Sequence, residues 1–78
     1  MARVPAVSRL LVECGVALYG SQWQSPLARD LGVTDRTVRR WVAGATAVPS
    51  GLYVDLLRLT QERAAELEAL AARIREAP

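Results

Sequence analysis

Three arginines, Arg36, Arg39 and Arg40, lie within five residues of one another in the stretch DRTVRRWVA. A guanidinium donates hydrogen bonds in a rigid planar fork that matches phosphate oxygens and the O6 and N7 atoms of guanine. On a helix that turns about 100° per residue, the three arginines share one side, and Val38 and Trp41 fall on the other. We therefore expect Arg36 and Arg40 to meet base edges and Arg39 to divide between bases and phosphate.

Polar residues on both sides of the arginine cluster extend this face. Thr34 and Thr37 flank the cluster and are expected to reach phosphates. Asp35 would accept a hydrogen bond from a cytosine amino group, or serve only the helix dipole. Gln24 and Ser25 stand at the start of the preceding predicted helix, whose free backbone N–H groups also suit phosphate. Together with the arginines, these five residues form the predicted nucleic-acid face.

Apolar residues recur at helical spacing along the whole chain, and no clean alternation indicates a strand. Helices are therefore expected over four segments, residues 6–19, 26–31, 35–43 and about 51–76. With 78 residues, the chain (1–78) is expected to form one small all-α domain that ends in a long C-terminal helix. Gly15, inside the first helix, is expected to allow another helix to approach closely.

Capping residues mark the ends of the two short central helices. Ser25 is expected to cap the first of them, with Pro26 at its first helical position, where a missing N–H is tolerated. Gly32 ends that helix, and Thr34 caps the next one. Two short helices joined by three residues are typical of a helix-turn-helix, here over residues 24–44.

The long C-terminal helix carries an apolar stripe that is interrupted by Arg63. In one interpretation, its first half completes the core and its second half is a solvated extension. In the other, which we favour because the stripe exceeds the needs of so small a domain, the helix joins two chains. A dimer would place two recognition helices about 34 Å apart, where they read an inverted repeat in double-stranded DNA. The residues expected to form this homodimer face are Leu56, Leu59, Leu67, Leu70 and Ile74.

All ten basic residues are arginine, in a chain of net charge +2. This choice favours contact with phosphate and guanine, and GC-rich coding would produce it as well. Residues 1–45 carry six arginines against three acidic residues, a net charge of +3. Residues 46–78 carry four arginines against five acidic residues, a net charge of −1. The N-terminal part is therefore the candidate for contact with a polyanion.

Several kinds of site are not expected. The chain has one cysteine, Cys14, and no histidine, which argues against an internal disulfide and a structural zinc site. The lone thiol suggests a small buried hydrophobe in a reducing compartment. No catalytic constellation or phosphate-cradling glycine loop is present, so we expect neither an enzyme nor a cofactor. No apolar run is long enough to span a bilayer, and a cytoplasmic location is expected.

Residues 24–44, QSPLARDLGVTDRTVRRWVAG, resemble the helix-turn-helix of Cro/CI-type phage repressors and the wider xenobiotic-response-element regulators. The positions that agree with that family are Leu27, Ala28, Leu31, Gly32, Val33, Val38 and Trp41. The resemblance implies that base contacts come from Asp35, Arg36, Arg39 and Arg40, and that Gln24 touches phosphate. The whole chain is similar to small prophage regulators, among them anti-CRISPR-associated autorepressors. Family members often have five helices, however, and Pro26 is not typical of the first motif helix.

Two functions of different classes are therefore expected. The first is a dimeric, sequence-specific transcription regulator, a repressor of phage or prophage type that blocks a promoter, with its own promoter as a candidate. The alternative is a protein-interaction module, such as an antitoxin or an adaptor, whose long helix binds another protein. A DNA-binding domain of a recombination or packaging protein is a further reading of the same motif.

Overall fold

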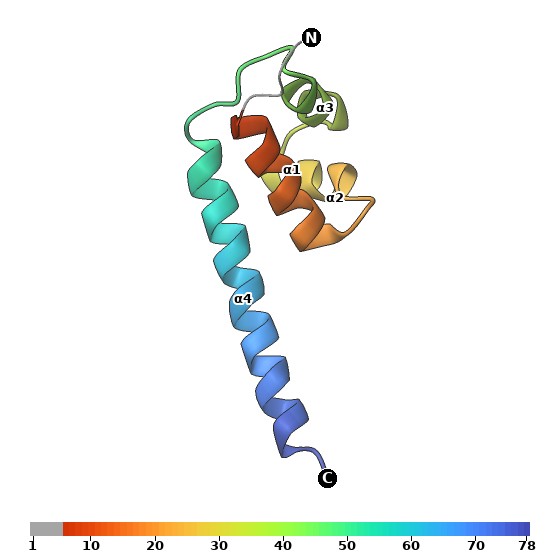
Figure 1. Ribbon diagram of the computed structural model, residues 1–78, viewed down its shortest axis with the longest axis vertical. Coiled ribbons are helices and arrows are strands. Elements are labelled where there is room, and N and C mark those ends of the chain that lie inside the picture. The colour runs from red at the N-terminus through yellow and green to blue at the C-terminus, as the bar shows by residue number, and fades with distance from the viewer. Residues whose placement is uncertain (1–5) are drawn as a thin grey trace.

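The computed structural model describes residues 6–78, so the first five residues of the predicted domain lie outside it. Four helices follow one another along the chain: α1 (Ala6–Tyr19), α2 (Gln24–Leu31), α3 (Asp35–Ala43) and α4 (Leu52–Glu76). In Figure 1, α1, α2 and α3 gather beside the first half of α4, and the second half of α4 extends beyond them. The described part of the chain contains no strand, and the predicted all-α fold with its long C-terminal helix is confirmed.

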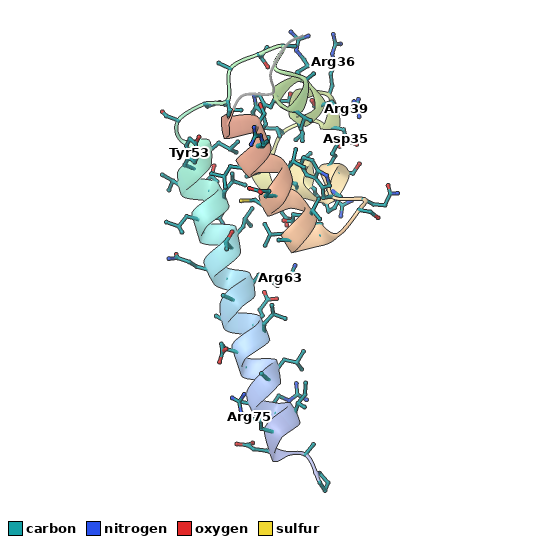
Figure 2. All side chains as sticks on the ribbon, viewed as in Figure 1. Asp35, Arg36, Arg39, Tyr53, Arg63 and Arg75 are labelled. Carbon is teal, nitrogen blue, oxygen red and sulfur yellow. The ribbon has the colours of Figure 1, made fainter. Side chains whose placement is uncertain are left out.

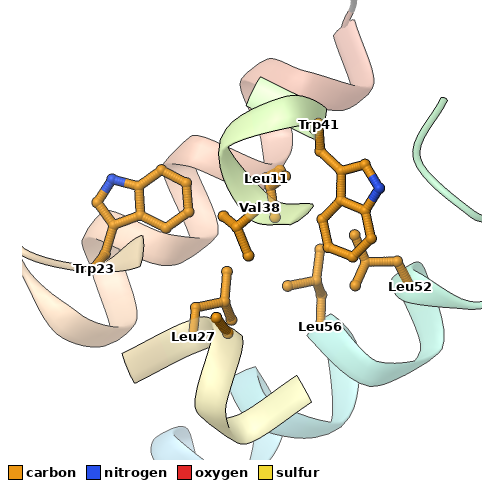
Figure 3. Close-up of a cluster of buried hydrophobic side chains, with 8 residues drawn as sticks. Leu11, Trp23, Leu27, Val38, Trp41, Leu52 and Leu56 are labelled. Atoms are coloured by element: carbon orange, nitrogen blue, oxygen red, sulfur yellow. The ribbon is translucent and has the colours of Figure 1, made fainter. Parts of the chain in front are cut away.

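The core lies where the first three helices meet the first turns of α4 (Figure 3). Leu11, Leu27 and Val38 have no exposed surface, and the two tryptophans are each only 6% exposed. Burial of such an aliphatic side chain contributes about 1.5–3 kcal/mol relative to leaving it exposed. The buried cluster comprises Leu11, Trp23, Leu27, Ala28, Val38, Trp41, Leu52 and Leu56.

This packing corrects part of the predicted dimer face. Leu56 is 5% exposed and lies in the core, and Leu59 packs against the core. Both follow Leu52 at helical spacing, so they share the face of α4 that closes the domain. Leu56 is therefore used inside its own chain and is not available to a second one. The exposed part of the stripe begins further along, at Leu67, Leu70 and Ile74.

The start of α2 differs from the prediction, because the helix begins at Gln24 rather than at Pro26. Ser25 is not its cap, since the N-cap position is held by Trp23 without any side-chain cap bond. The Ser25 hydroxyl bonds Asp35 instead. Pro26 occupies the third helical position, which it tolerates because the first N–H groups of a helix have no intrahelical partner.

We expect from the sequence that Gly15 allows another helix to approach closely. The group that lies against Gly15 is instead the ring of Trp23. A Cβ atom placed on Gly15 would lie 2.0 Å from Cε3 of Trp23. The indole of Trp23 therefore lies directly against the backbone of α1. This contact ties the segment before α2 to the first helix.

The turn between α2 and α3 is closed by its own backbone. Gly32 adopts a left-handed conformation with φ of 74°, and the N–H of Val33 donates to the carbonyl of Ala28 at 2.9 Å. This is the bond of a Schellman motif, which satisfies a free carbonyl at the end of α2. The predicted N-cap of α3 is confirmed, because Thr34 Oγ1 accepts the N–H of Thr37 at 3.2 Å. Both ends of the turn thus fix the direction of α3.

Arg63 interrupts the apolar stripe of α4 because it contacts the end of α1. Its Nη1 donates to the carbonyl of Leu18 at 2.8 Å, and its Nε lies 3.6 Å from Oε2 of Glu66. The last carbonyls of a helix lack intrahelical partners and carry partial negative charge. A cation at this point therefore joins α4 to α1 where the apolar contact between them ends.

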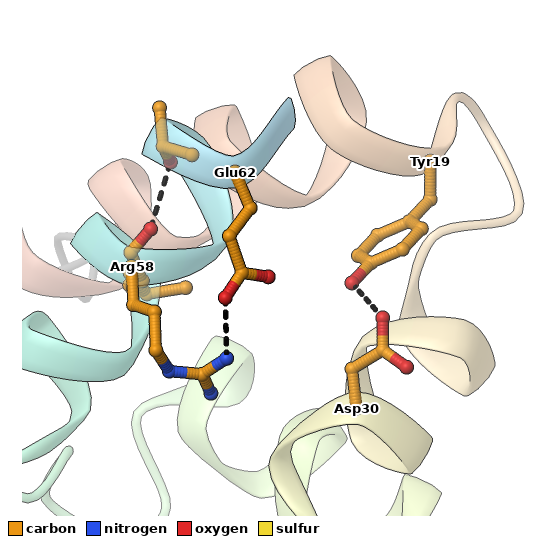
Figure 4. A network of polar contacts seen from close by, with 6 residues as sticks. Tyr19, Asp30, Arg58 and Glu62 are labelled. Atoms are coloured by element: carbon orange, nitrogen blue, oxygen red, sulfur yellow. Dashed lines mark hydrogen bonds and ion pairs between the residues drawn. The ribbon is translucent and has the colours of Figure 1, made fainter. Parts of the chain in front are cut away.

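Two further hydrogen bonds tie α1 to the helix-turn-helix. The hydroxyl of Tyr19 donates to Oδ2 of Asp30 on α2, as Figure 4 shows beside the Arg58–Glu62 pair of α4. The buried hydroxyl of Ser8 donates to the carbonyl of Trp41 on α3 at 2.9 Å. Each bond satisfies a polar group where two helices meet, so α1 contacts both α2 and α3 and fixes their positions.

Candidate nucleic-acid interface

The outer side of α3 carries the arginine cluster. Arg36, Arg39 and Arg40 are all exposed, whereas Val38 is 0% and Trp41 is 6% exposed. Figure 2 shows Arg36 and Arg39 on the side of α3 that faces away from α4. The predicted separation of charge and apolar surface on opposite faces of this helix is confirmed.

The arginines of α3 meet no carboxylate within residues 6–78. The ion pairs in this part of the chain, Arg58–Glu62 at 3.2 Å and Arg63–Glu66 at 3.6 Å, both lie on α4. Three like charges on adjacent turns repel one another, and Asp35, the one acidic residue of α3, forms no ion pair with them. The positive charge of α3 is therefore free to meet an anion from outside.

Asp35 and Ser25 connect the beginnings of the two motif helices. The Ser25 hydroxyl donates to Oδ2 of Asp35. Asp35 also lies in the first turn of α3, where the helix dipole favours a negative charge. The bond brings two predicted site residues together. Sequence reasoning missed this bond because it assigned Ser25 to a cap within its own helix.

Thr34 and Thr37 form a second small group at the start of α3. Their hydroxyl oxygens are 2.9 Å apart, and either can be the donor. Two hydroxyl groups have two donors between them, and this contact uses one. One O–H donor therefore remains for a ligand beside the arginines.

A polar hollow of about 320 Å³ lies between α3 and the start of α2. It is lined by residues 21–25 and by Arg39. The first N–H groups of α2 have no intrahelical partner, and their partial positive charge adds to that of the guanidinium. Such a place suits a phosphate group. The predicted residues Gln24, Ser25 and Arg39 thus meet at one spot.

Sequence reasoning did not single out Ser21 and Gln22, which line the same hollow. The available signal was this pair of polar residues, which lies between Gly20, the residue after α1, and Trp23. Because Trp23 is anchored against Gly15, the residues on both sides of it are held at the surface next to α3. The predicted face therefore consists of two adjoining parts, the outer side of α3 and this hollow.

No known protein family, curated protein or solved structure matches this chain. The resemblance of residues 24–44 to Cro/CI-type repressors is therefore an expectation from the sequence motif alone. Among residues 6–78, no helix combines the length and apolar character that a membrane crossing requires.

Proposed function

We propose that this chain is a sequence-specific DNA-binding transcription regulator of the Cro/CI-like helix-turn-helix type. The observation that carries the proposal is the arginine face of α3, which is exposed and meets no carboxylate within residues 6–78. The opposite face of the same helix is sealed by Val38 and Trp41. An α-helix fits the major groove of B-DNA, and an arginine there can donate two hydrogen bonds to one guanine.

The parts of this face would divide the work of recognition. Arg36 and Arg40 meet base edges and specify sequence, while phosphate contacts fix the register of α3 in the groove. Arg39 lines the hollow beside Gln24 and Ser25, which favours phosphate for its guanidinium. The O–H donor that remains at Thr34 and Thr37 would bind the phosphate backbone of the DNA next to α3.

A dimer belongs to this proposal. Leu67, Leu70 and Ile74 are exposed on the part of α4 that extends beyond the other helices. Two copies would present two recognition helices about 34 Å apart and read an inverted repeat. A protein bound in this way would block a promoter, as a phage-type repressor does, and its own promoter is the first candidate.

Selection of binding sites from random duplexes, followed by titration of the selected DNA at two salt concentrations, tests the proposal. We expect an inverted repeat and an affinity that falls steeply with salt. Arg40→Ala should cost about 1–3 kcal/mol at one base position. Arg39→Ala should weaken all sequences alike and lower the salt slope by about 1.

The matched control is Arg75→Ala, which removes the same charge at the far end of α4 (Figure 2). It should leave both affinity and sequence preference nearly unchanged. If no duplex is selected, or if Arg75→Ala weakens binding as much as Arg40→Ala does, the proposal is wrong.

A second candidate function is a protein-interaction module, such as an antitoxin or an adaptor. It is favoured by the same apolar side chains of α4, which are 57% (Leu67), 48% (Leu70) and 66% (Ile74) exposed. Its signature would be a stable heteromeric complex, with DNA binding that is weak or depends on the partner. Co-purification with a tagged chain, before and after nuclease treatment, separates the two functions.

A further inference from the structure

The second half of α4 has an apolar face that its own chain does not cover. In Figure 1 this half of the helix extends past α1, α2 and α3. Most of the stability of a helix in a protein comes from packing of its apolar face, and short isolated helices are marginal in water. The exposed leucines and isoleucine of this segment therefore need a partner surface.

A continuous groove lies where α1 meets α4, next to this face. It consists of two hollows, of about 340 Å³ and 360 Å³. Cys14 and Thr60 line both hollows, so the two are joined, and we call them together the α1–α4 groove. The other walls are largely apolar and include Leu10, Tyr53 and Leu57 in the first hollow and Ala17, Ala64 and Leu67 in the second.

The spacing of the hollows matches the spacing of the exposed side chains. Leu57 in the first hollow and Ala64 in the second are seven residues apart on α4, which is about 10 Å along a helix. Leu67 and Ile74 are also seven residues apart and lie on nearly the same face. Antiparallel packing that sets Leu67 opposite Ala64 also sets Ile74 opposite Leu57.

We propose that the α1–α4 groove is the homodimer interface of this protein and that the second half of α4 from a second copy fills it in the antiparallel direction. Leu67 and Ile74 of each chain occupy the two hollows of the other. The inference deepens the dimer of the proposed function and rests on that function for its role in DNA reading. The assembly itself depends only on the surfaces described here.

The size of the surface agrees with a stable dimer. A helix of 25 residues is about 37 Å long and about 10 Å wide, so half of its lateral surface is roughly 600 Å². With the side chains that α1 adds to the groove, this approaches the roughly 800 Å² that each partner buries in a standard interface.

A second copy is favoured over a different protein because the surface is complementary to itself. The groove and the exposed side chains are parts of the same chain. A two-fold axis that fills the groove of one copy therefore covers the exposed face of the other, and the contact closes. A different partner that filled the groove would cover Leu67, which lines it, but would leave Leu70 and Ile74 of this chain in water.

Cys14 provides a direct test, because it lines both hollows and is the only cysteine. The proposed register sets residue 71 of the second chain opposite Thr60, next to Cys14. In Ala71→Cys, we therefore expect a disulfide between residue 71 of one chain and Cys14 of the other. Within one chain, residue 71 lies about 16 Å along α4 from Thr60, which is next to Cys14. A disulfide requires Cα atoms within about 7 Å, so residues 14 and 71 of the same chain cannot form one.

Mild oxidation at about pH 9 is suitable, because burial raises the pKa of the Cys14 thiol and a thiolate is the reactive form. Most of Ala71→Cys should become a covalent dimer on a non-reducing gel, and adding Cys14→Ser should abolish it. Ala69→Cys, on the opposite face of α4, is the matched control and should remain monomeric on the gel. A covalent dimer that survives Cys14→Ser would mean that residue 71 meets residue 71 of the other chain, in another register or direction, and either that result or the absence of any covalent dimer overturns the proposal.

Sedimentation of the unaltered chain supplies a second test. We expect a dimer, and Leu67→Glu or Ile74→Glu should raise its dissociation constant more than tenfold, because each buries a charge. Ala69→Glu is the control, since Ala69 is exposed and lies on the opposite face of α4. A monomer at tens of micromolar, or a dimer that tolerates both changes, overturns the proposal.

The two proposals fail in different ways. A chain that forms the expected disulfide but selects no duplex contradicts the DNA-binding function alone. A chain that selects an inverted repeat but gives no link between residues 14 and 71 contradicts only the groove-filling dimer. Circular dichroism of each variant excludes unfolding as the cause, since the substituted residues of the second half of α4 lie outside the core.

Discussion

α3 and the second half of α4 are both amphipathic helices with several arginines, but only α3 has its apolar face covered. Val38 and Trp41 of α3 are 0% and 6% exposed, against 57% and 66% for Leu67 and Ile74 of α4. The turn before α3 directs that helix back onto α1 and α2, whereas α4 continues straight past its last neighbour. A periodic sequence thus determines which face of a helix is apolar, but the elements around the helix determine what covers it.

The largest expected effect tests whether the buried core and the exposed second half of α4 differ in their contribution to stability. Leu27→Ala should lower the free energy of unfolding by about 3 kcal/mol, because Leu27 is 0% exposed and its loss leaves a cavity. Leu70→Ala removes the same atoms from a residue that is 48% exposed, and in dilute protein it should cost less than about 0.5 kcal/mol. Denaturant titrations followed by tryptophan fluorescence measure both.

The comparison breaks down if Leu70→Ala and Leu27→Ala cost the same at every protein concentration. A cost for Leu70→Ala that appears only as the protein is concentrated is the expected behaviour of a dimer, because mass action then favours the associated state.

A second prediction compares the tight packing around α1 with the open start of α4. Gly15→Ala should destabilise the fold by about 2 kcal/mol, because the new Cβ would overlap the ring of Trp23, which is itself buried. Gly51→Ala meets nothing within 4 Å and should change stability by less than about 0.5 kcal/mol. Thermal melts of the two variants give the difference. Equal melting temperatures would mean that Trp23 can leave its place on α1 at little cost.

Local signals in the sequence were enough to predict most of the fold. The bounds of α1 and α3 agree with the prediction, and α4 begins at Leu52, one residue after the predicted start. The cap of α3 at Thr34 was correct because a cap involves residues three positions apart. The start of α2 was wrong because Ser25 has a second partner, Asp35, ten residues away, with which its hydroxyl bonds.

In the candidate site too, local features could be predicted from the sequence and contacts between distant residues could not. The outward direction of the arginines follows from the helical period, which a sequence contains. The hollow between α2 and α3 could not be predicted, because it depends on the ring of Trp23 against Gly15 and on the packing of Arg39 beside residues 21–25. The bond from Arg63 to the Leu18 carbonyl joins residues 45 positions apart. The reason why an arginine interrupts the apolar stripe of α4 is therefore visible only in the folded structure.

Arg63 stands at the boundary between the covered and uncovered parts of α4 and gives a third prediction. Arg63→Met keeps the apolar stem of the side chain but removes its bond to the Leu18 carbonyl, which should cost about 1 kcal/mol, together with its exposed pair with Glu66. Arg58→Met breaks only an exposed pair with Glu62 and should be nearly neutral. Urea titrations of the two variants test this. A neutral Arg63→Met would show that the apolar contacts of α4 suffice to hold it against α1.

The smallest effect concerns Tyr19, which ties the covered side of α1 to α2. Burial first, and the hydrogen bond to Asp30 second, raise the pKa of Tyr19 from its usual 10.0 to about 12. Because the folded pKa exceeds the unfolded value, the stabilising contribution of this phenol is complete below pH 10 and is lost as pH rises from 10 to 12.

Tyr19→Phe has no phenol to titrate, so its melting temperature should fall less than that of the unaltered chain across this pH window. The difference should be small, because Tyr19 is partly exposed and solvent screens its bond to Asp30. Equal losses in both proteins would show that the bond is not maintained in solution. Apart from the buried bond of Ser8 to the Trp41 carbonyl, the contact of α1 with α2 and α3 would then depend on apolar packing. The covered and uncovered regions would differ mainly in whether a neighbouring apolar surface is present.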